Sequence, residues 1–189
     1  LADHGRYAVT SQETEPSLGW AYASFLEKLV SNPSMSGADL GRYIVDSYIE
    51  DDERIQDSSA RSEFVGRGSP LSSFYGGAPS ADQIVRQLTP TTTLAVVDLS
   101  AVPELIDAVN NFSFILQGTN QRAVAQARSY SQSFTSIFGT NVPPSYIDLG
   151  HFVQLAAQAA GESRVTQAAE GVLDALEKAV VAEKHGSKK

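Results

Sequence analysis

A run of consecutive apolar residues, Leu94-Ala95-Val96-Val97, constrains the fold of this 189-residue chain more than any other stretch. The run shows no alternation of apolar and polar residues. Such a pattern is typical of a strand that is buried on both faces, as in a parallel sheet covered by helices. We therefore predict a buried strand from Thr91 to Leu99, and a strand of this kind needs neighbouring strands.

One other stretch has the composition of a strand. Tyr7, Val9 and Thr10 belong to a short aromatic and β-branched run near the start of the chain. Two strands with no hairpin turn between them do not form a stable sheet on their own. Either the partner strands lie outside this sequence, or the strand assignment is wrong.

Helical periodicity dominates the remainder of the chain. We predict helices at residues 20–31, 36–50, 81–88, 101–117, 120–138, 148–160 and 163–184. Residues 51–80 are predicted to form a long flexible loop, because a charge run opens this segment and Ser, Gly and Arg fill it. A loop of this length in a compact domain is usually functional or disordered. The chain thus divides into an α/β part, residues 1–99, and a helical part, residues 100–189.

The composition excludes several classes of function. A net charge of −8 at pH 7 argues against non-specific binding of nucleic acid and favours cationic substrates. No apolar run approaches the roughly 18 residues of a membrane-spanning helix. The chain has no cysteine, which excludes disulfides, thiolate metal sites and a cysteine nucleophile within these residues. Leu1 is not an initiator methionine and polar residues follow it, so we expect an internal or processed piece.

An acidic and aromatic loop follows the first strand, and it is the best candidate site. It contains Glu13, Glu15, Gly19 and Trp20, the single tryptophan of the chain. Ligand sites in α/β proteins lie at the carboxyl ends of strands, on the loops that follow them. A structural interpretation stays open, in which both carboxylates are solvated loop charges and Trp20 belongs to the core.

Four stretches, taken in order, resemble the clostripain-like cysteine peptidases of the caspase and gingipain clan. They are Ser11-Gln12-Glu13 with Glu15-Pro16 and Gly19-Trp20-Ala21-Tyr22, then Gly41-Arg42-Tyr43-Ile44-Val45-Asp46-Ser47-Tyr48, then Leu94-Ala95-Val96-Val97-Asp98-Leu99-Ser100, and Tyr146-Ile147-Asp148-Leu149-Gly150-His151-Phe152. The resemblance spans about residues 1–184. It implies a caspase-like α/β core with a parallel sheet, to which this chain supplies about two strands, followed by a mainly helical C-terminal region.

The same resemblance implies what the chain lacks. The family's reaction needs a His and a Cys, and in the family both precede the segment that begins here at Leu1. The chain would therefore be an internal to C-terminal fragment without the catalytic dyad, and no catalytic residue is assigned. A further strand is expected just past Lys189. Family members of this kind are bacterial and secreted, so we expect an extracellular or cell-envelope location.

The family's preference for cleavage after Arg or Lys implies a carboxylate in the specificity pocket, because a guanidinium or ammonium group pairs with a carboxylate. Glu13 and Glu15 are the available carboxylates, and the choice between them stays open. Trp20 would form a wall for the aliphatic stem of the substrate side chain. The predicted substrate-binding residues are Ser11, Glu13, Glu15 and Trp20. The expected partners are a peptide or protein substrate with a basic side chain and the rest of the peptidase, with no nucleic acid and no membrane.

Two acidic motifs contain side chains that could bind a metal ion. The resemblance implies calcium dependence in some members, and Asp51-Asp52-Glu53 offers oxygen ligands, but its spacing is not that of an EF-hand loop. Asp148 and His151 share a helical face, and we favour a helix cap at Asp148 over a metal pair.

The alternative function is of a different class. The absent dyad and the Ala-rich C-terminal helices are also typical of a non-catalytic helical module that binds another protein.

Overall fold

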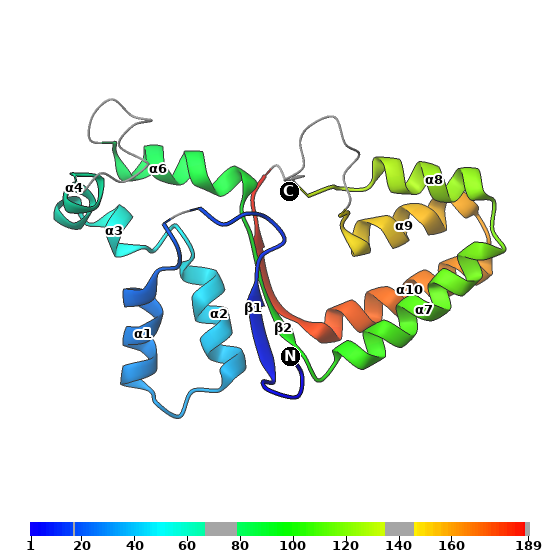
Figure 1. The fold of residues 1–189 in the computed structure, drawn as a ribbon, viewed down its shortest axis with the longest axis horizontal. Coiled ribbons are helices and arrows are strands. Elements are labelled where there is room, and N and C mark those ends of the chain that lie inside the picture. The colour runs from blue at the N-terminus through cyan, green and yellow to red at the C-terminus, as the bar shows by residue number, and fades with distance from the viewer. Residues whose placement is uncertain (17, 67–78, 135–145, 188–189) are drawn as a thin grey trace. The chain divides into compact units, whose positions relative to one another are not determined.

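The computed structural model describes residues 1–16, 18–66, 79–134 and 146–187 (Figure 1). The elements, in chain order, are β1 (Tyr7–Thr10), α1 (Tyr22–Ser31), α2 (Gly37–Ser47), α3 (Glu53–Gln56), α4 (Ser58–Gly66), α6 (Ala81–Leu88), a 3-10 turn (Thr89–Thr91), β2 (Thr93–Asp98), α7 (Val102–Gln117), α8 (Gln121–Tyr130), α9 (Leu149–Ala160), α10 (Ser163–Ala179) and β3 (Val180–His185). The described part of the chain is therefore mainly helical, with one small sheet. None of its helices is long and apolar enough to cross a membrane.

The chain forms two compact units. One comprises Leu1–Arg6 and Val97–Val181, and the other comprises Tyr7–Val96 and Ala182–Lys189. The first unit is an assembly of α7 to α10, whereas the second contains α1 to α4, α6 and most of the sheet.

The sheet has three strands in the order β1-β2-β3, so β2 is the central strand (Figure 1). Leu99, just after β2, donates its N–H to the carbonyl of Arg6, just before β1, at 2.7 Å. Gly186, just after β3, donates its N–H to the carbonyl of Thr92, just before β2, at 2.9 Å. The end of one strand thus pairs with the start of its neighbour in both cases, which makes the sheet antiparallel.

The prediction of a parallel sheet with two strands from this chain is wrong. A second neighbour of β2 within this chain is β3, most of which lies inside the predicted last helix. α10 ends at Ala179 because Val180 adopts an extended conformation, with φ −90° and ψ 107°. Val180 and Val181 are β-branched residues, which favour a strand over a helix.

The buried face of β2 packs directly against α2. Val96 is fully buried, and Gly41 of α2 lies so close to it that an added Cβ would come within 2.6 Å of the Val96 Cγ1 atom. Gly37, at the start of α2, lies against the ring of Tyr7 of β1 in the same way. The two glycines therefore allow the helix backbone to approach the sheet closely, as α2 and β1 show in Figure 1.

The helical unit has its own apolar core. α10 packs on α7 and α9, and α8 packs on α9. The fully or nearly buried core residues come from all four helices: Phe112, Ala127, Val153, Ala156, Val165, Ala168, Ala169 and Val172. Phe112 and Phe152 meet edge to face at 6.2 Å between ring centroids. The predicted end of α9 is confirmed, because Gly161 takes the left-handed conformation with φ 64°.

The predicted loop at residues 51–80 is wrong for the part that forms α3 and α4. Asp52 accepts a hydrogen bond from the Arg54 N–H and so caps α3. Asp57 accepts hydrogen bonds from Ser59 N–H and Ala60 N–H at the start of α4. These local caps satisfy the exposed amides of two short helices within a polar sequence. Residues 67–78 of the predicted loop lie outside the described residues.

The predicted helix at residues 120–138 ends early, at Tyr130. Ser131 is extended, with ψ 145°, and Ser133 pairs with Ile147 in an isolated antiparallel bridge. Residues 135–138 lie outside the described residues.

Removal of a core aromatic ring should separate buried from exposed positions on one helix. Phe112→Ala should lower the free energy of unfolding by about 3–5 kcal/mol, because it opens a cavity where the ring is only 2% exposed. Phe114→Ala is the matched control, since Phe114 on the same helix is 72% exposed and its loss should cost less than about 0.5 kcal/mol. Urea denaturation measures both changes, and equal effects would contradict the assigned core.

A pair of helical glycines should respond oppositely to the same substitution. Gly41→Ala should lower the free energy of unfolding by about 1–3 kcal/mol, because the new methyl group overlaps Val96. Gly171→Ala in α10, where nothing lies within 4 Å of the added Cβ, should raise it by about 0.5–1 kcal/mol through helix propensity. Denaturant midpoints of the two variants test this, and a stabilising Gly41→Ala would show that α2 does not approach β2 so closely.

Candidate functional site

The acidic loop begins at the end of β1 and is anchored to the first residue of β2. The Thr93 hydroxyl oxygen accepts hydrogen bonds from Gln12 N–H at 3.0 Å and Glu13 N–H at 3.1 Å. The hydroxyl oxygens of Thr93 and Ser11 are also hydrogen-bonded to each other, at 3.0 Å. The Ser11 hydroxyl donates to the Glu13 carbonyl at 2.8 Å. Thr93 is 5% exposed, so the start of the loop is fixed by a buried hydroxyl.

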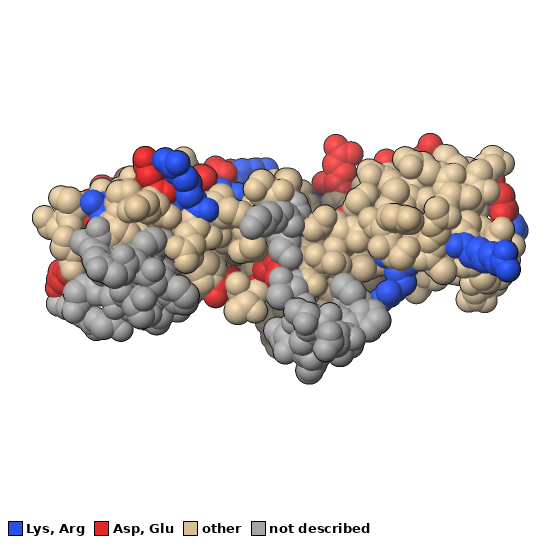
Figure 2. Space-filling view, turned by 90° about the horizontal axis from the view of Figure 1, so that it is seen from above, with Lys and Arg blue, Asp and Glu red and all other residues tan. Residues whose placement is uncertain are grey.

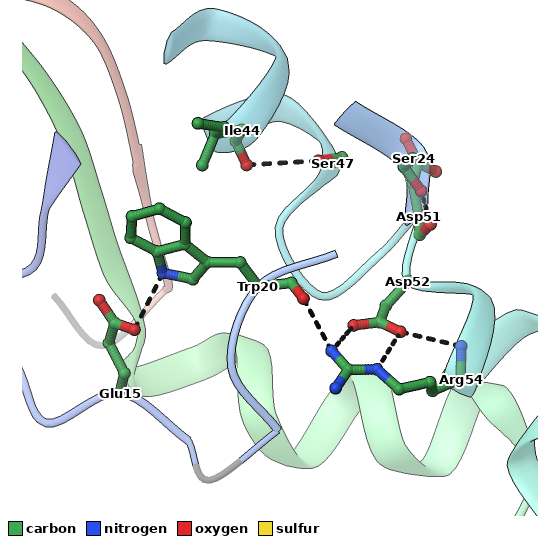
Figure 3. Close-up of polar contacts among 8 residues, drawn as sticks. All are labelled: Glu15, Trp20, Ser24, Ile44, Ser47, Asp51, Asp52 and Arg54. Carbon is green, nitrogen blue, oxygen red and sulfur yellow. Dashed lines mark hydrogen bonds and ion pairs between the residues drawn. The ribbon is translucent and has the colours of Figure 1, made fainter. Parts of the chain in front are cut away.

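Glu15 and Trp20 contact each other farther along the loop. The Trp20 indole N–H donates to the Glu15 Oε2 atom at 2.9 Å, as Figure 3 shows. Gly19 makes the turn between them, with φ 72° and a hydrogen bond from its N–H to the Pro16 carbonyl at 3.1 Å. The Trp20 ring also stacks on Tyr22, with 6.3 Å between the ring centroids. The loop therefore folds back so that an aromatic ring borders a carboxylate.

No cation among the described residues pairs with the Glu15 carboxylate. Its hydrogen-bond donor, the indole, is neutral. Within the described residues Glu15 forms no ion pair and no hydrogen bond other than the one from Trp20. The charge also acts on buried Tyr48, whose pKa lies above its ordinary value because of burial first and Glu15 second.

An ion pair from α3 supports the same loop (Figure 3). Arg54 contacts the Asp52 carboxylate through two nitrogens, with Nε 2.9 Å from Oδ1 and Nη2 2.6 Å from Oδ2. The Nη2 atom also donates to the Trp20 carbonyl at 2.7 Å. The hydrogen bond to Asp52 raises the pKa of the Arg54 guanidinium, and the Asp52 charge adds to this against the opposing effect of burial.

The four predicted substrate-binding residues lie in one loop, and their contacts divide them into two pairs. Ser11 and Glu13 belong to the Thr93 anchor, and Glu15 contacts Trp20. Sequence reasoning missed Thr93, Asp52 and Arg54. The signal for the last two was weak, because Asp51-Asp52-Glu53-Arg54 has the composition of a solvated charge run, although Asp52 is 1% exposed.

The two motifs weighed as metal sites have structural partners. Asp52 pairs with Arg54, as described above. The Asp148 Oδ1 atom accepts a hydrogen bond from His151 N–H at 2.6 Å, which confirms the predicted cap of α9. The His151 Nδ1 atom accepts from Gln132 N–H at 3.0 Å. Across the residues that the structure describes, no group of three His, Cys, Asp or Glu side chains could hold a metal ion.

A shallow pocket of about 610 Å³ lies on α6, away from the acidic loop in sequence. Its lining residues are all polar: Ser80, Asp82, Gln83, Arg86 and Gln87. Asp82 and Arg86 form an exposed ion pair at 3.6 Å, so the pocket offers no buried reactive group. Figure 2 shows one face of the molecule, on which acidic and basic atoms of the described residues are interspersed.

Comparison with known proteins gives one result. The model of the Clostripain family matches residues 1–189, which is the whole sequence. No curated protein and no solved structure matches the chain. A match of this length shows the family, and the sequence itself contains no cysteine to act as the nucleophile. The chain therefore belongs to the Clostripain family of peptidases.

Proposed function

We propose that this chain supplies the specificity loop of a clostripain-like cysteine endopeptidase that cleaves after Arg or Lys, and that Glu15 binds the basic side chain. The observation that carries the proposal is the Glu15 carboxylate, which a neutral indole N–H positions at 2.9 Å and which no described cation neutralises. Family membership over all 189 residues supports the reaction class.

Glu15 suits a guanidinium or ammonium group for two reasons. A carboxylate that lacks a cationic partner gains a charge-assisted hydrogen bond when a basic side chain arrives. The neighbouring Trp20 ring offers an apolar face to the methylene stem, and an aromatic face also attracts a cation. For Glu13 the contacts described above hold the peptide N–H and carbonyl, whereas for Glu15 the Trp20 indole positions the carboxylate itself.

The residues of this chain bind and orient, whereas the bond-breaking groups belong to the rest of the peptidase. In that reaction a thiolate prepared by a nearby His attacks the peptide carbonyl, the C–N bond breaks, and the amine leaves with the proton of the imidazolium. Water then hydrolyses the thioester of the acyl-enzyme and releases the acid and the thiol. A salt bridge to Glu15 would fix the side chain before the scissile bond. The proposed partners are therefore the remainder of the peptidase and a peptide or protein with a basic side chain.

Charge removal at the two loop carboxylates tests the proposal in the complete peptidase that contains this chain. Glu15→Gln should lower kcat/KM for arginyl substrates at least about tenfold, because loss of the partner of a basic side chain typically costs about 2–5 kcal/mol. Substrates with an uncharged side chain before the cut should change much less, since the chemistry takes place elsewhere. Initial rates on matched arginyl and uncharged peptides give the comparison.

Glu13→Gln is the matched control, with the same change of charge two residues away. A tenfold loss at Glu13 in place of Glu15 would move the specificity acid to Glu13. If both variants keep arginyl kcat/KM within about twofold of the parent, the loop is a structural connection. The helical interaction module would then be the better function, and Ile106 and Phe114, which are 53% and 72% exposed on α7, would be its first contact residues to test.

A further inference from the structure

One guanidinium joins the acidic loop to a segment that lies 34 residues away in sequence. The Arg54 Nη2 atom lies 2.7 Å from the carbonyl oxygen of Trp20. The indole of that same residue holds Glu15. Hydrogen bonds therefore run without a break from Asp52 through Arg54 and Trp20 to Glu15, as Figure 3 shows.

Residues at the start of α3 and in α4 fix the position of the Arg54 guanidinium. The Asp52 carboxylate is 1% exposed, contacts two guanidinium nitrogens and also caps α3 through Arg54 N–H at 2.8 Å. The ring of Phe64 in α4 lies under the guanidinium, with 5.7 Å from Cζ to the ring centroid. A planar fork that is bound along one edge and covered on one face has little freedom to turn.

The turn at Trp20 needs this support. Trp20 lies just before α1, whose N-cap residue Ala21 provides no side-chain cap. The described backbone groups of this turn make two local hydrogen bonds, from Gly19 N–H to Pro16 and from Tyr22 N–H to Trp20, together with the one from Arg54. The Trp20 side chain adds the bond to Glu15 and the stack on Tyr22, both of which lie close by in sequence. Ser24 in α1 donates to the Asp51 carbonyl at 2.7 Å, so the segment before α3 also contacts α1.

We infer that Arg54 is a positioning residue, which holds Trp20 and through it the Glu15 carboxylate in the arrangement that binds a basic side chain. The inference rests on the proposed function of Glu15. Asp52 is the counter-ion of this guanidinium, and Arg54 acts on the loop through the backbone carbonyl of Trp20. Its removal should therefore loosen the loop without changing the charge at Glu15.

The first experiment uses Trp20 as a reporter, because it is the single tryptophan of the chain. Arg54→Met alone would leave the Asp52 charge buried without its partner and would destabilise the fold. The variant to use is therefore Asp52→Asn with Arg54→Met, in which the amide oxygen still caps α3 and no buried charge remains. Arg42→Met with Asp39→Asn is the matched control, since that ion pair in α2 is exposed and does not contact the loop.

The Asp52→Asn/Arg54→Met variant should show at least about a twofold rise in acrylamide quenching of Trp20, with loss of the helical circular-dichroism signal confined to a small fraction. The control pair should leave quenching at the parent value. Unchanged quenching in a folded Asp52/Arg54 variant overturns the inference, whatever the result for Glu15→Gln.

The second experiment asks whether Arg54 acts through Glu15 in the complete peptidase. Asp52→Asn/Arg54→Met should lower the preference for arginyl over uncharged substrates about tenfold, because a misplaced binding group loses much of its effect. In a Glu15→Gln background the same pair should produce no further loss of preference. An additional loss of equal size in that background overturns the inference, because Arg54 would then act independently of Glu15.

The outcomes for the two proposals are distinguishable. If Glu15→Gln leaves the preference for arginine unchanged, the proposed function fails. A rise in Trp20 quenching under those conditions still supports Arg54 as the residue that positions the loop.

Discussion

The burial of the central strand is the constraint on which the second unit depends. β2 is apolar from Leu94 to Val97, and Leu94, Ala95 and Val96 are at most 4% exposed. A strand in this environment must satisfy its peptide groups on both edges, because a buried peptide group without a partner is costly. β1 and β3 supply these partners, and α2 covers the strand closely because Gly41 has no side chain to keep it away from Val96.

The start of the acidic loop is also held by β2. Thr93, the first residue of β2, accepts hydrogen bonds from the N–H groups of Gln12 and Glu13 through its side chain, where β1 has already ended. One hydroxyl thus extends the pairing of β1 and β2 beyond the regular ladder. The more distant part of the loop, with Glu15 and Trp20, contacts Arg54 instead. The two ends of the loop are therefore supported by different elements of the same unit.

Short-range patterns predicted much of the secondary structure, and long-range pairings were missed for identifiable reasons. The buried strand at residues 93–98, the cap at Asp148 and the left-handed Gly161 all follow from a few neighbouring residues. β3 was missed because Val172, Leu176 and Val180 continue the helical spacing, so the periodicity runs past the true helix end at Ala179. Val180-Val181 was the contrary signal, and two β-branched residues do not outweigh seventeen residues of helical pattern.

The antiparallel direction of the sheet had no local signal at all. An unalternating apolar run indicates burial on both faces, and a central strand in an antiparallel sheet satisfies that condition as well as a parallel strand does.

The candidate site shows the same difference between local contacts, which the sequence predicts, and long-range contacts, which it does not. Glu15 and Trp20 lie five residues apart and were predicted together, whereas Arg54 lies 34 residues from Trp20 within a charge run.

The charge of Arg54 is paired with Asp52 and not with a carboxylate of the acidic loop. An arginine beside an acidic binding loop would ordinarily neutralise the carboxylate and lower its attraction for a second cation. Arg54 instead forms an ion pair with Asp52, and the hydrogen bond to Asp52 raises the pKa of the guanidinium. Its contact with the loop is to a backbone carbonyl. Glu15 meanwhile accepts from a neutral indole. Under the proposed function, this arrangement would leave the Glu15 charge to pair with a basic side chain while Arg54 contacts the loop backbone.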